Sequence, residues 1–377
     1  MTVDRSVFKP RLARHIAFLL TSLTLIALPI AGCSATTGSN DTGGAAGTVA
    51  RPLLSGEPVW GKTPAYLYGV NDGVNWDPQH NMDVGAEGAS IQAKLKAAQV
   101  PIARVWFFQY SLVDNHPLSD AEQLQKLHAV QAAGMTCFAN FPTENTADYD
   151  LHLLGLLRGA CRYVEIMNEP DLEQAAWNGG QTVNSTAYLK FWNQFIPQAR
   201  KSYPGILFGG PADYNNQGNE CTYTPSGSTC FLQKVLIGMA KSGVLPDFVT
   251  YHWYPCWNNT ADQCLALASQ FDQAAAQVVG WARQYFPGKH IPVICSEWNA
   301  DPGNPSYMSD QTWMAKFVTA ALGSIQKSDL AGAMEFDISS YGNWGTDDLF
   351  EIYNGGKPKA QFNALADAIA AAKGSKG

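Results

Sequence analysis

The sequence is poor in charged residues, and in positive charge most of all. Asp, Glu, Lys and Arg make up 15% of its 377 residues, and 25 basic against 32 acidic side chains leave a net charge of −7. A nucleic-acid-binding protein needs clustered Lys and Arg to neutralise phosphates, and the chain beyond residue 33 offers no such cluster. We therefore expect no nucleic-acid partner.

The common short motifs of metal and nucleotide sites are also missing from the sequence. No two cysteines have CxxC spacing and no two histidines have HxxxH spacing, so the usual zinc patterns are absent. The stretch GVNDGVN (69–75) follows the first apolar run but contains no GxGxxG, which a dinucleotide-binding turn would need. We therefore expect neither a metal ion nor an organic cofactor.

An apolar run of 15 residues (16–30) stands near the N-terminus, behind four basic side chains, and is too short to span a membrane comfortably. It leads into IAGC, so that the segment resembles a bacterial lipoprotein signal in which Cys33 is lipidated. The alternative is an ordinary signal peptide that contains a cysteine. Ser34 is similar to the residue that sorts lipoproteins to the outer membrane. We expect a protein that is exported and anchored to the outer membrane only through Cys33, or secreted.

Residues 34–52 contain almost no large apolar side chain and cannot bury enough surface to become ordered. We therefore divide the chain into a signal and lipidation site (1–33), a flexible linker (34–56) and one folded domain (57–377).

The eight cysteines fit an exported protein, in which nearby thiols can be oxidised. Cys221/Cys230 and Cys256/Cys264 lie close together in loop-like segments, and we expect each to pair. Cys295 lies in an apolar run and is expected to be a buried free thiol. Cys137 and Cys161 can pair or stay free.

Short apolar runs alternate with longer helical patterns along the whole folded part. The eight runs are 65–71, 102–108, 135–141, 163–167, 206–210, 247–254, 291–298 and 332–338, and the helical patterns include 89–99, 120–133, 184–202, 261–285, 310–327 and 359–373. Alternation of this kind predicts parallel strands with right-handed crossovers. Eight units predict an α/β fold with a closed (β/α)8 TIM barrel, in which functional residues follow the carboxyl ends of the strands. The alternative is an open doubly wound sheet.

Two carboxylates follow strands that would lie opposite each other in such a barrel. Glu169 comes after the fourth run in YVEIMNEP, and Glu297 ends the seventh in VICSEW. Side chains from opposite walls can converge on one bond. Two carboxyl groups about 5–5.5 Å apart form the catalytic pair of a retaining glycosidase.

The motifs MNEP and SEWN resemble the signature of glycoside hydrolase clan A, and ILFGGPA and FVTYHWYP are similar to glycoside hydrolase family 39. The resemblance covers nearly the whole folded part. It implies a (β/α)8 catalytic domain in which Glu169 is the general acid/base and Glu297 the nucleophile. It also implies that Asn168 bonds the sugar 2-hydroxyl and that Arg104 keeps Glu297 ionised.

The same resemblance gives roles to the strand-six motif HWY. Tyr254 would donate a hydrogen bond to Glu297, and His252 would help to position the site. Two positions depart from the pattern: Phe336 stands where clan members often have a tryptophan after strand eight, and Asn140 stands where some relatives have a histidine.

Tryptophan is abundant, with 11 residues, and aromatic faces stack well on sugar rings. We expect Trp76, Trp177, Trp298 and Trp344 to bind substrate, although Trp298 can serve barrel packing instead. Tryptophans that fall in helices or in the lead-in are expected to pack in the core; they are Trp60, Trp192, Trp281 and Trp313.

The sequence thus predicts a monomeric retaining β-glycoside hydrolase that cleaves a β-linked polysaccharide or oligosaccharide by double displacement. Endo action is expected because no β-sandwich module like that of family 39 xylosidases follows the eighth helix, which favours an open groove. The alternatives are a transglycosylase on the same fold and a non-catalytic surface glycan-binding lipoprotein.

Overall fold

Eight parallel strands close into a barrel whose order around the axis follows the order along the chain, with β14 pairing back onto β3. The computed structural model describes residues 53–77, 79–216, 218–224, 227–340 and 345–374. The barrel strands are β3 (Gly69–Asn71), β4 (Ile102–Trp106), β5 (Thr136–Phe141), β6 (Cys161–Ile166), β9 (Leu207–Asp213), β12 (Phe248–Trp253), β13 (Val293–Trp298) and β14 (Gly332–Glu335). The predicted (β/α)8 barrel is confirmed.

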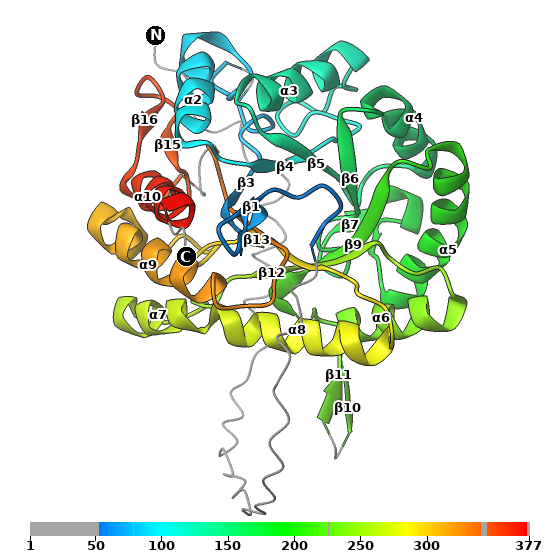
Figure 1. The fold of residues 1–377 in the computed structure, drawn as a ribbon. Helices are drawn as coiled ribbons and strands as arrows, with labels where there is room; N and C mark the ends of the chain where they lie inside the picture. Colours follow the sequence, from blue (N-terminus) through cyan, green and yellow to red (C-terminus); the bar gives the residue numbers. More distant parts are fainter. Residues whose placement is uncertain (1–52, 78, 217, 225–226, 341–344, 375–377) are drawn as a thin grey trace, which may run out of the picture. The chain divides into compact units, whose positions relative to one another are not determined.

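Helices cover the outside of this barrel as a ring (Figure 1). They are α2 (Gly85–Ala98), α3 (Asp120–Ala132), α4 (Ala147–Leu157), α5 (Ser185–Ser202), α6 (Phe231–Ser242), α7 (Ala261–Leu267), α8 (Phe271–Tyr285), α9 (Gln311–Ile325) and α10 (Ala360–Gly374). Several begin at a side chain that caps the free backbone N–H groups. Ser119 and Thr260, for example, form capping boxes with Glu122 and Gln263.

Short two-stranded pairs and 3-10 helices lie before the first barrel strand and in the segments that connect the barrel strands and helices. The two-stranded pairs are β1 (Val59–Trp60) with β2 (Thr63–Pro64), β7 (Gln174–Ala175) with β8 (Gln181–Thr182), β10 (Thr222–Thr224) with β11 (Gly227–Thr229), and β15 (Phe350–Glu351) with β16 (Lys357–Pro358). The 3-10 helices are η2 (Ala65–Tyr68), η3 (Ala176–Asn178), η4 (Tyr214–Asn216), η5 (Ala268–Gln270) and η6 (Ser306–Ser309). No helix of the described part is long and apolar enough to cross a membrane.

Most observed elements begin or end a few residues away from the predicted bounds, and three of them differ for a clear structural reason. Of the run 65–71, only Gly69–Asn71 is strand, because the first four residues form η2. The last run, 332–338, stops being strand after Glu335. The helix expected over 261–285 is interrupted by η5. There the Ser324 hydroxyl of α9 accepts from the Asp272 N–H and donates to the Ser269 carbonyl, so a side chain replaces helical backbone bonds.

Side-chain alternation along the strands separates an apolar barrel floor from a polar mouth. Ile102, Phe138 and Tyr163 belong to the apolar cluster inside the barrel. Two residues further along the same three consecutive strands, the Glu165 carboxylate accepts hydrogen bonds from both Arg104 and Asn140. Since residues i and i+2 face the same side of a strand, the polar layer lies directly above the apolar one.

Within the described residues three disulfides are formed, and they include both predicted pairs, Cys221–Cys230 and Cys256–Cys264. The third joins Cys137 of β5 to Cys161 of β6, the pair that the sequence left open. Cys295 is a buried free thiol, as predicted. The predicted signal and nearly all of the predicted linker, residues 1–52, lie outside the described residues.

Candidate active site

Glu169 lies just beyond the end of β6, where the backbone turns sharply. Met167 and Glu169 adopt left-handed φ values of 69° and 38°, which cost most residues about 1–2 kcal/mol. Hydrogen bonds to both neighbouring strands hold the turn: the Met167 N–H donates to the Phe141 carbonyl (2.8 Å), and the Glu169 N–H donates to the Ala212 carbonyl (3.0 Å). The turn directs Glu169 toward the barrel mouth.

Glu297 reaches the same mouth from β13. Ile294 faces the barrel floor, and Glu297 three residues later also faces inward, which strict alternation does not allow. The pairing register of β13 with β14 shifts between Cys295 and Trp298, and a shift of this kind resets the direction of the side chains. The irregularity therefore places a carboxylate at the mouth.

The two carboxylates converge on each other around His252. One oxygen of Glu169, one oxygen of Glu297 and a ring nitrogen of His252 lie within 4.8 Å of one another. His252 Nδ1 is 2.8 Å from Glu169 Oε1 and 3.8 Å from Glu297 Oε1. Among the described residues, these three form the only group of acidic, histidine and cysteine side chains compact enough to hold an ion. The same atoms already hydrogen-bond within the site, and no ion is needed to hold this geometry.

Glu297 is held on both carboxylate oxygens. The Tyr254 hydroxyl donates to Oε1 at 2.6 Å, and Arg104 Nη1 donates to Oε2 at 3.0 Å. Burial raises the pKa of the Glu297 carboxyl, and the Arg104 guanidinium opposes that rise. Two hydrogen bonds to the charged form, one of them from a cation, favour the ionised state. Tyr254 makes the contact that the sequence predicted for it.

Glu169 has a different environment. Its side chain is 18% exposed against 8% for Glu297, and its one side-chain partner among the described residues is His252. Burial raises the pKa of Glu169 to about 7, and burial lowers the pKa of His252 to about 4. Near neutral pH the imidazole is therefore neutral, and a protonated Glu169 can donate to Nδ1. The environment of Glu169 suits an acid, and the two hydrogen bonds to the carboxylate of Glu297 suit a nucleophile.

Arg104 links the elements of the site to one another. It is fully buried and donates from Nε to Glu165 Oε2 (2.6 Å), from Nη1 to Asn71 Oδ1 (3.0 Å) and from Nη2 to Asn168 Oδ1 (2.6 Å), besides the bond to Glu297. One planar group thus fixes side chains from β3, β6 and β13.

Glu165 and Asn71 were not predicted as site residues. Asn140 Nδ2 donates to Glu165 Oε2 (2.7 Å) and to the Met167 carbonyl (2.9 Å), so Asn140 supports the acid that supports Arg104. A signal for Glu165 was present in the sequence. It is a lone carboxylate inside the apolar run YVEIM, two residues after an inward-facing tyrosine.

We expect Arg104→Met to lower the free energy of unfolding by about 3–5 kcal/mol, because Glu165 and Glu297 would be left buried without their cation. Arg200→Met is the matched control. It breaks a partly exposed pair with Asp247 and should cost about 1 kcal/mol or less. Chemical denaturation of both variants measures the difference, and equal losses would contradict the central role of Arg104.

An aromatic cluster forms one wall of the mouth. It contains Trp76, Trp106, Phe108, Tyr254 and Phe336. Trp76 packs edge-on against Trp106 at 5.3 Å and against Phe336 at 6.3 Å between ring centroids. Phe336 thus belongs to the same wall as Trp76 and Tyr254. Trp76 lies in this wall with 9% of it exposed, and its binding of substrate stays a prediction.

The other tryptophans that were predicted to bind substrate lie in different environments. Trp298 is fully buried and packs edge-on against Phe271 of α8, so it serves barrel packing rather than the mouth. Trp177 is half-buried, and its indole N–H donates to the Thr143 carbonyl at 2.8 Å, beside Asn168. Trp344 lies outside the described residues.

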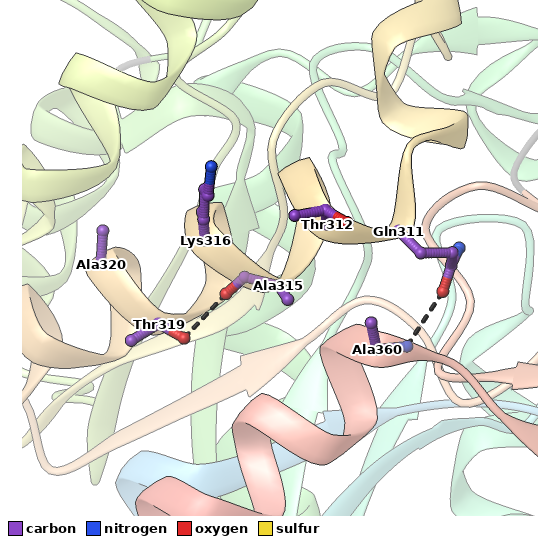
Figure 2. A pocket seen from close by; sticks show the side chains of 7 residues that line it. All are labelled: Gln311, Thr312, Ala315, Lys316, Thr319, Ala320 and Ala360. Carbon is purple, nitrogen blue, oxygen red and sulfur yellow. Dashed lines mark hydrogen bonds between the residues drawn. The ribbon is translucent and has the colours of Figure 1, made fainter.

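A surface groove of about 590 Å³ lies away from this site (Figure 2). Six of its seven lining residues belong to α9 and the seventh begins α10; they are Gln311, Thr312, Ala315, Lys316, Thr319, Ala320 and Ala360. The Thr319 hydroxyl bonds the Ala315 carbonyl, and the Gln311 side chain bonds the Ala360 N–H. Since these lining residues include no carboxylate and no aromatic ring, the groove gives no support to a second reactive centre.

Comparison with known proteins supports the fold. The sequence matches no family model and no curated protein. The structure is similar to a glucosidase from Croceicoccus marinus (15% identity, 81% of this chain and 68% of that chain, TM-score 0.61). It is also similar to GH5_18 from Streptomyces cattleya in complex with GlcNAc (14%, 81% and 80%, 0.58).

A family 39 glycoside hydrolase from Bacteroides cellulosilyticus WH2 is a third similar structure (12% identity, 83% of this chain and 64% of that chain, TM-score 0.53). Family 39 is therefore one among several groups of similar barrels. At these identities the likeness bears on the fold.

Proposed function

We propose that the protein is a retaining β-glycoside hydrolase. The observation that carries the proposal is the convergence of Glu169 and Glu297, with oxygens within 4.8 Å, where burial raises the pKa of Glu169 to about 7 and Arg104 and Tyr254 hydrogen-bond the carboxylate of Glu297. This spacing suits direct attack by a carboxylate, since an inverting pair stands about 6.5–9.5 Å apart to admit a water. The similar barrels of a glucosidase and a family 39 glycoside hydrolase support the same class.

The proposed reaction has two displacements. Protonated Glu169 gives its proton to the leaving oxygen while Glu297 attacks the anomeric carbon, which forms a glycosyl-enzyme ester and breaks the glycosidic bond. Ionised Glu169 then takes a proton from water, and the water oxygen displaces Glu297 from the anomeric carbon. Both residues return to their starting states, and the sugar keeps its configuration.

Asn168 and Arg104 complete the site in this proposal. The Asn168 amide stands next to Glu169 in the chain and shares Arg104 with Glu297, so it lies beside the anomeric carbon. Its N–H group is suited to the neighbouring sugar hydroxyl, a contact that tightens in the transition state.

The substrate of the proposal is a β-linked polysaccharide or oligosaccharide, cleaved internally. The aromatic wall of Trp76, Trp106 and Phe336 and the nearby Trp177 supply apolar ring faces for sugars. A monomer anchored at Cys33 or secreted would meet such polymers outside the cytoplasm.

A panel of aryl β-glycosides and β-linked polysaccharides tests the proposal on protein that begins at residue 34. We expect release of reducing sugar from at least one polymer by the wild type, and none by the Glu169→Gln/Glu297→Gln double variant. Binding of a glycan without turnover, equal in both proteins, would favour the non-catalytic alternative.

A further inference from the structure

The Asn168 amide is held at both of its ends. Arg104 Nη2 donates to Asn168 Oδ1 at 2.6 Å, and Asn168 Nδ2 donates to Glu173 Oε1 at 2.8 Å. A guanidinium can only donate, so the amide oxygen must face Arg104 and the amide nitrogen must face Glu173. One of the two Nδ2 hydrogens is thereby used, and the other is left for a ligand.

The backbone of Asn168 is also fixed. Its N–H donates to the Thr143 hydroxyl at 3.0 Å, and the Thr143 hydroxyl donates to the Asn168 carbonyl. The main chain and the oxygen end of the amide are thus set by other elements. The hydrogen bond to Glu173 then fixes the direction of the amide nitrogen.

The chain folds back to bring Glu173 to this place. The N–H groups of Leu172 and Glu173 both donate to the Glu169 carbonyl, at 2.8 and 2.9 Å. This tight turn after Glu169 reverses the chain, so that the Glu173 side chain reaches the amide of Asn168. Its second oxygen, Oε2, is buried and has no hydrogen-bond partner in the part of the chain that the structure describes.

We propose that Glu173 is a positioning residue of the site: it aims the free N–H of Asn168 at the sugar hydroxyl beside the anomeric carbon. This inference rests on the proposed glycosidase function and adds a residue that the catalytic pair does not require. Glu173 acts through Asn168 and takes no part in the bond changes.

The electrostatics of Glu173 agree with this role. Burial raises its pKa well above the ordinary value, and the nearby carboxylates Glu144 and Glu169 raise it further. A protonated Glu173 carries its proton on the unpartnered Oε2 and keeps Oε1 as an acceptor for Asn168. It can thus hold the amide without adding a negative charge beside Glu297.

The test compares the best of the 4-nitrophenyl β-glucoside, β-xyloside and β-mannoside with the 2-deoxy analogue of the same sugar. For Glu173→Ala and Glu173→Leu we expect kcat on the parent glycoside to fall about 10- to 100-fold with little change in KM, as for a misplaced catalytic contact. On the 2-deoxy analogue, which lacks the hydroxyl, kcat should change less than about 3-fold. The preference for the parent sugar should therefore drop by about the same 10- to 100-fold.

Two variants serve as controls. Glu173→Gln keeps an acceptor oxygen at the same distance and should restore the preference to within about 5-fold of the wild type. Glu220→Gln replaces a carboxyl that bonds Ser185 and Lys234 and has no contact to Asn168, and should leave the preference unchanged. Thermal unfolding of each variant checks that it is folded. If the alanine variant does not fold, the leucine variant, which keeps a side chain of similar size, takes its place.

Equal losses on the parent and the 2-deoxy substrate, or no loss on either, would overturn the role of Glu173 while leaving the glycosidase intact. Absence of turnover by the wild type on these glycosides and on every polysaccharide of the panel would instead overturn the proposed function, and the inference with it. The two failures are therefore distinct.

Discussion

Replacing Glu297 with alanine is expected to lower kcat by about 10⁴-fold or more, because the variant lacks the carboxylate that forms the bond to the anomeric carbon in the proposed reaction. Arg104 and Tyr254 would each lose their hydrogen bond to Glu297. Steady-state kinetics with an activated aryl glycoside measures the loss. Added azide should restore part of the rate by entering the vacated space, and its product should be the α-glycosyl azide from a single displacement.

The azide product makes this prediction specific. Trp298→Phe is a suitable control, since it changes the next residue, which packs against Phe271 away from the mouth, and should keep most of the activity. A Glu297→Ala protein that retains a tenth of the activity, or one that yields a β-glycosyl azide, would contradict the assignment of Glu297 as nucleophile.

Replacing Glu169 with glutamine is expected to produce a loss that depends on the leaving group. A poor leaving group needs its proton, so kcat/KM on a polysaccharide or alkyl glycoside should fall about 10²–10⁴-fold. An activated leaving group, such as dinitrophenolate, departs without a proton, and the first step should then be nearly unaffected. Steady-state and burst kinetics on a series of aryl glycosides measure this dependence.

The pH profile gives an independent check of the same residue. The pKa of Glu169 is raised to about 7, so the carboxyl is protonated below that pH and ionised above it. The wild-type kcat/KM should therefore fall as the pH rises through about 7, and the Glu169→Gln protein should lack this alkaline limb. A limb that persists unchanged in the variant would assign the titration to another group.

Much of the architecture follows from the order of residue types along the chain. Eight β-rich runs alternating with helical patterns indicate parallel strands, and eight such strands can bury their polar edges by closing into a barrel. Because functional residues follow the carboxyl ends of barrel strands, Glu169 and Glu297 could be placed at one mouth before any coordinates. The resemblance to glycoside hydrolase clan A implied the contact of Tyr254 with Glu297, and the structure confirms the contact.

The site residues that were predicted wrongly or missed depend on local backbone geometry. Trp298 follows an inward carboxylate directly, and successive strand residues face opposite sides, so its packing against α8 follows from that parity. Glu173 could not be found in this way, because its place beside Asn168 depends on a turn over the Glu169 carbonyl that no periodicity encodes. Glu165 carried a signal, an acid inside an apolar strand, but its partner Arg104 comes from a different strand.

The most direct test of the central claim is the configuration of the first product. Proton NMR of a reaction with an aryl β-glycoside resolves the two anomers of the released sugar before they equilibrate by mutarotation. A site in which Glu297 attacks and Glu169 protonates predicts that the β-anomer appears first and the α-anomer only later. An α-anomer that appears first would show inversion, and would contradict the double displacement on which the account rests.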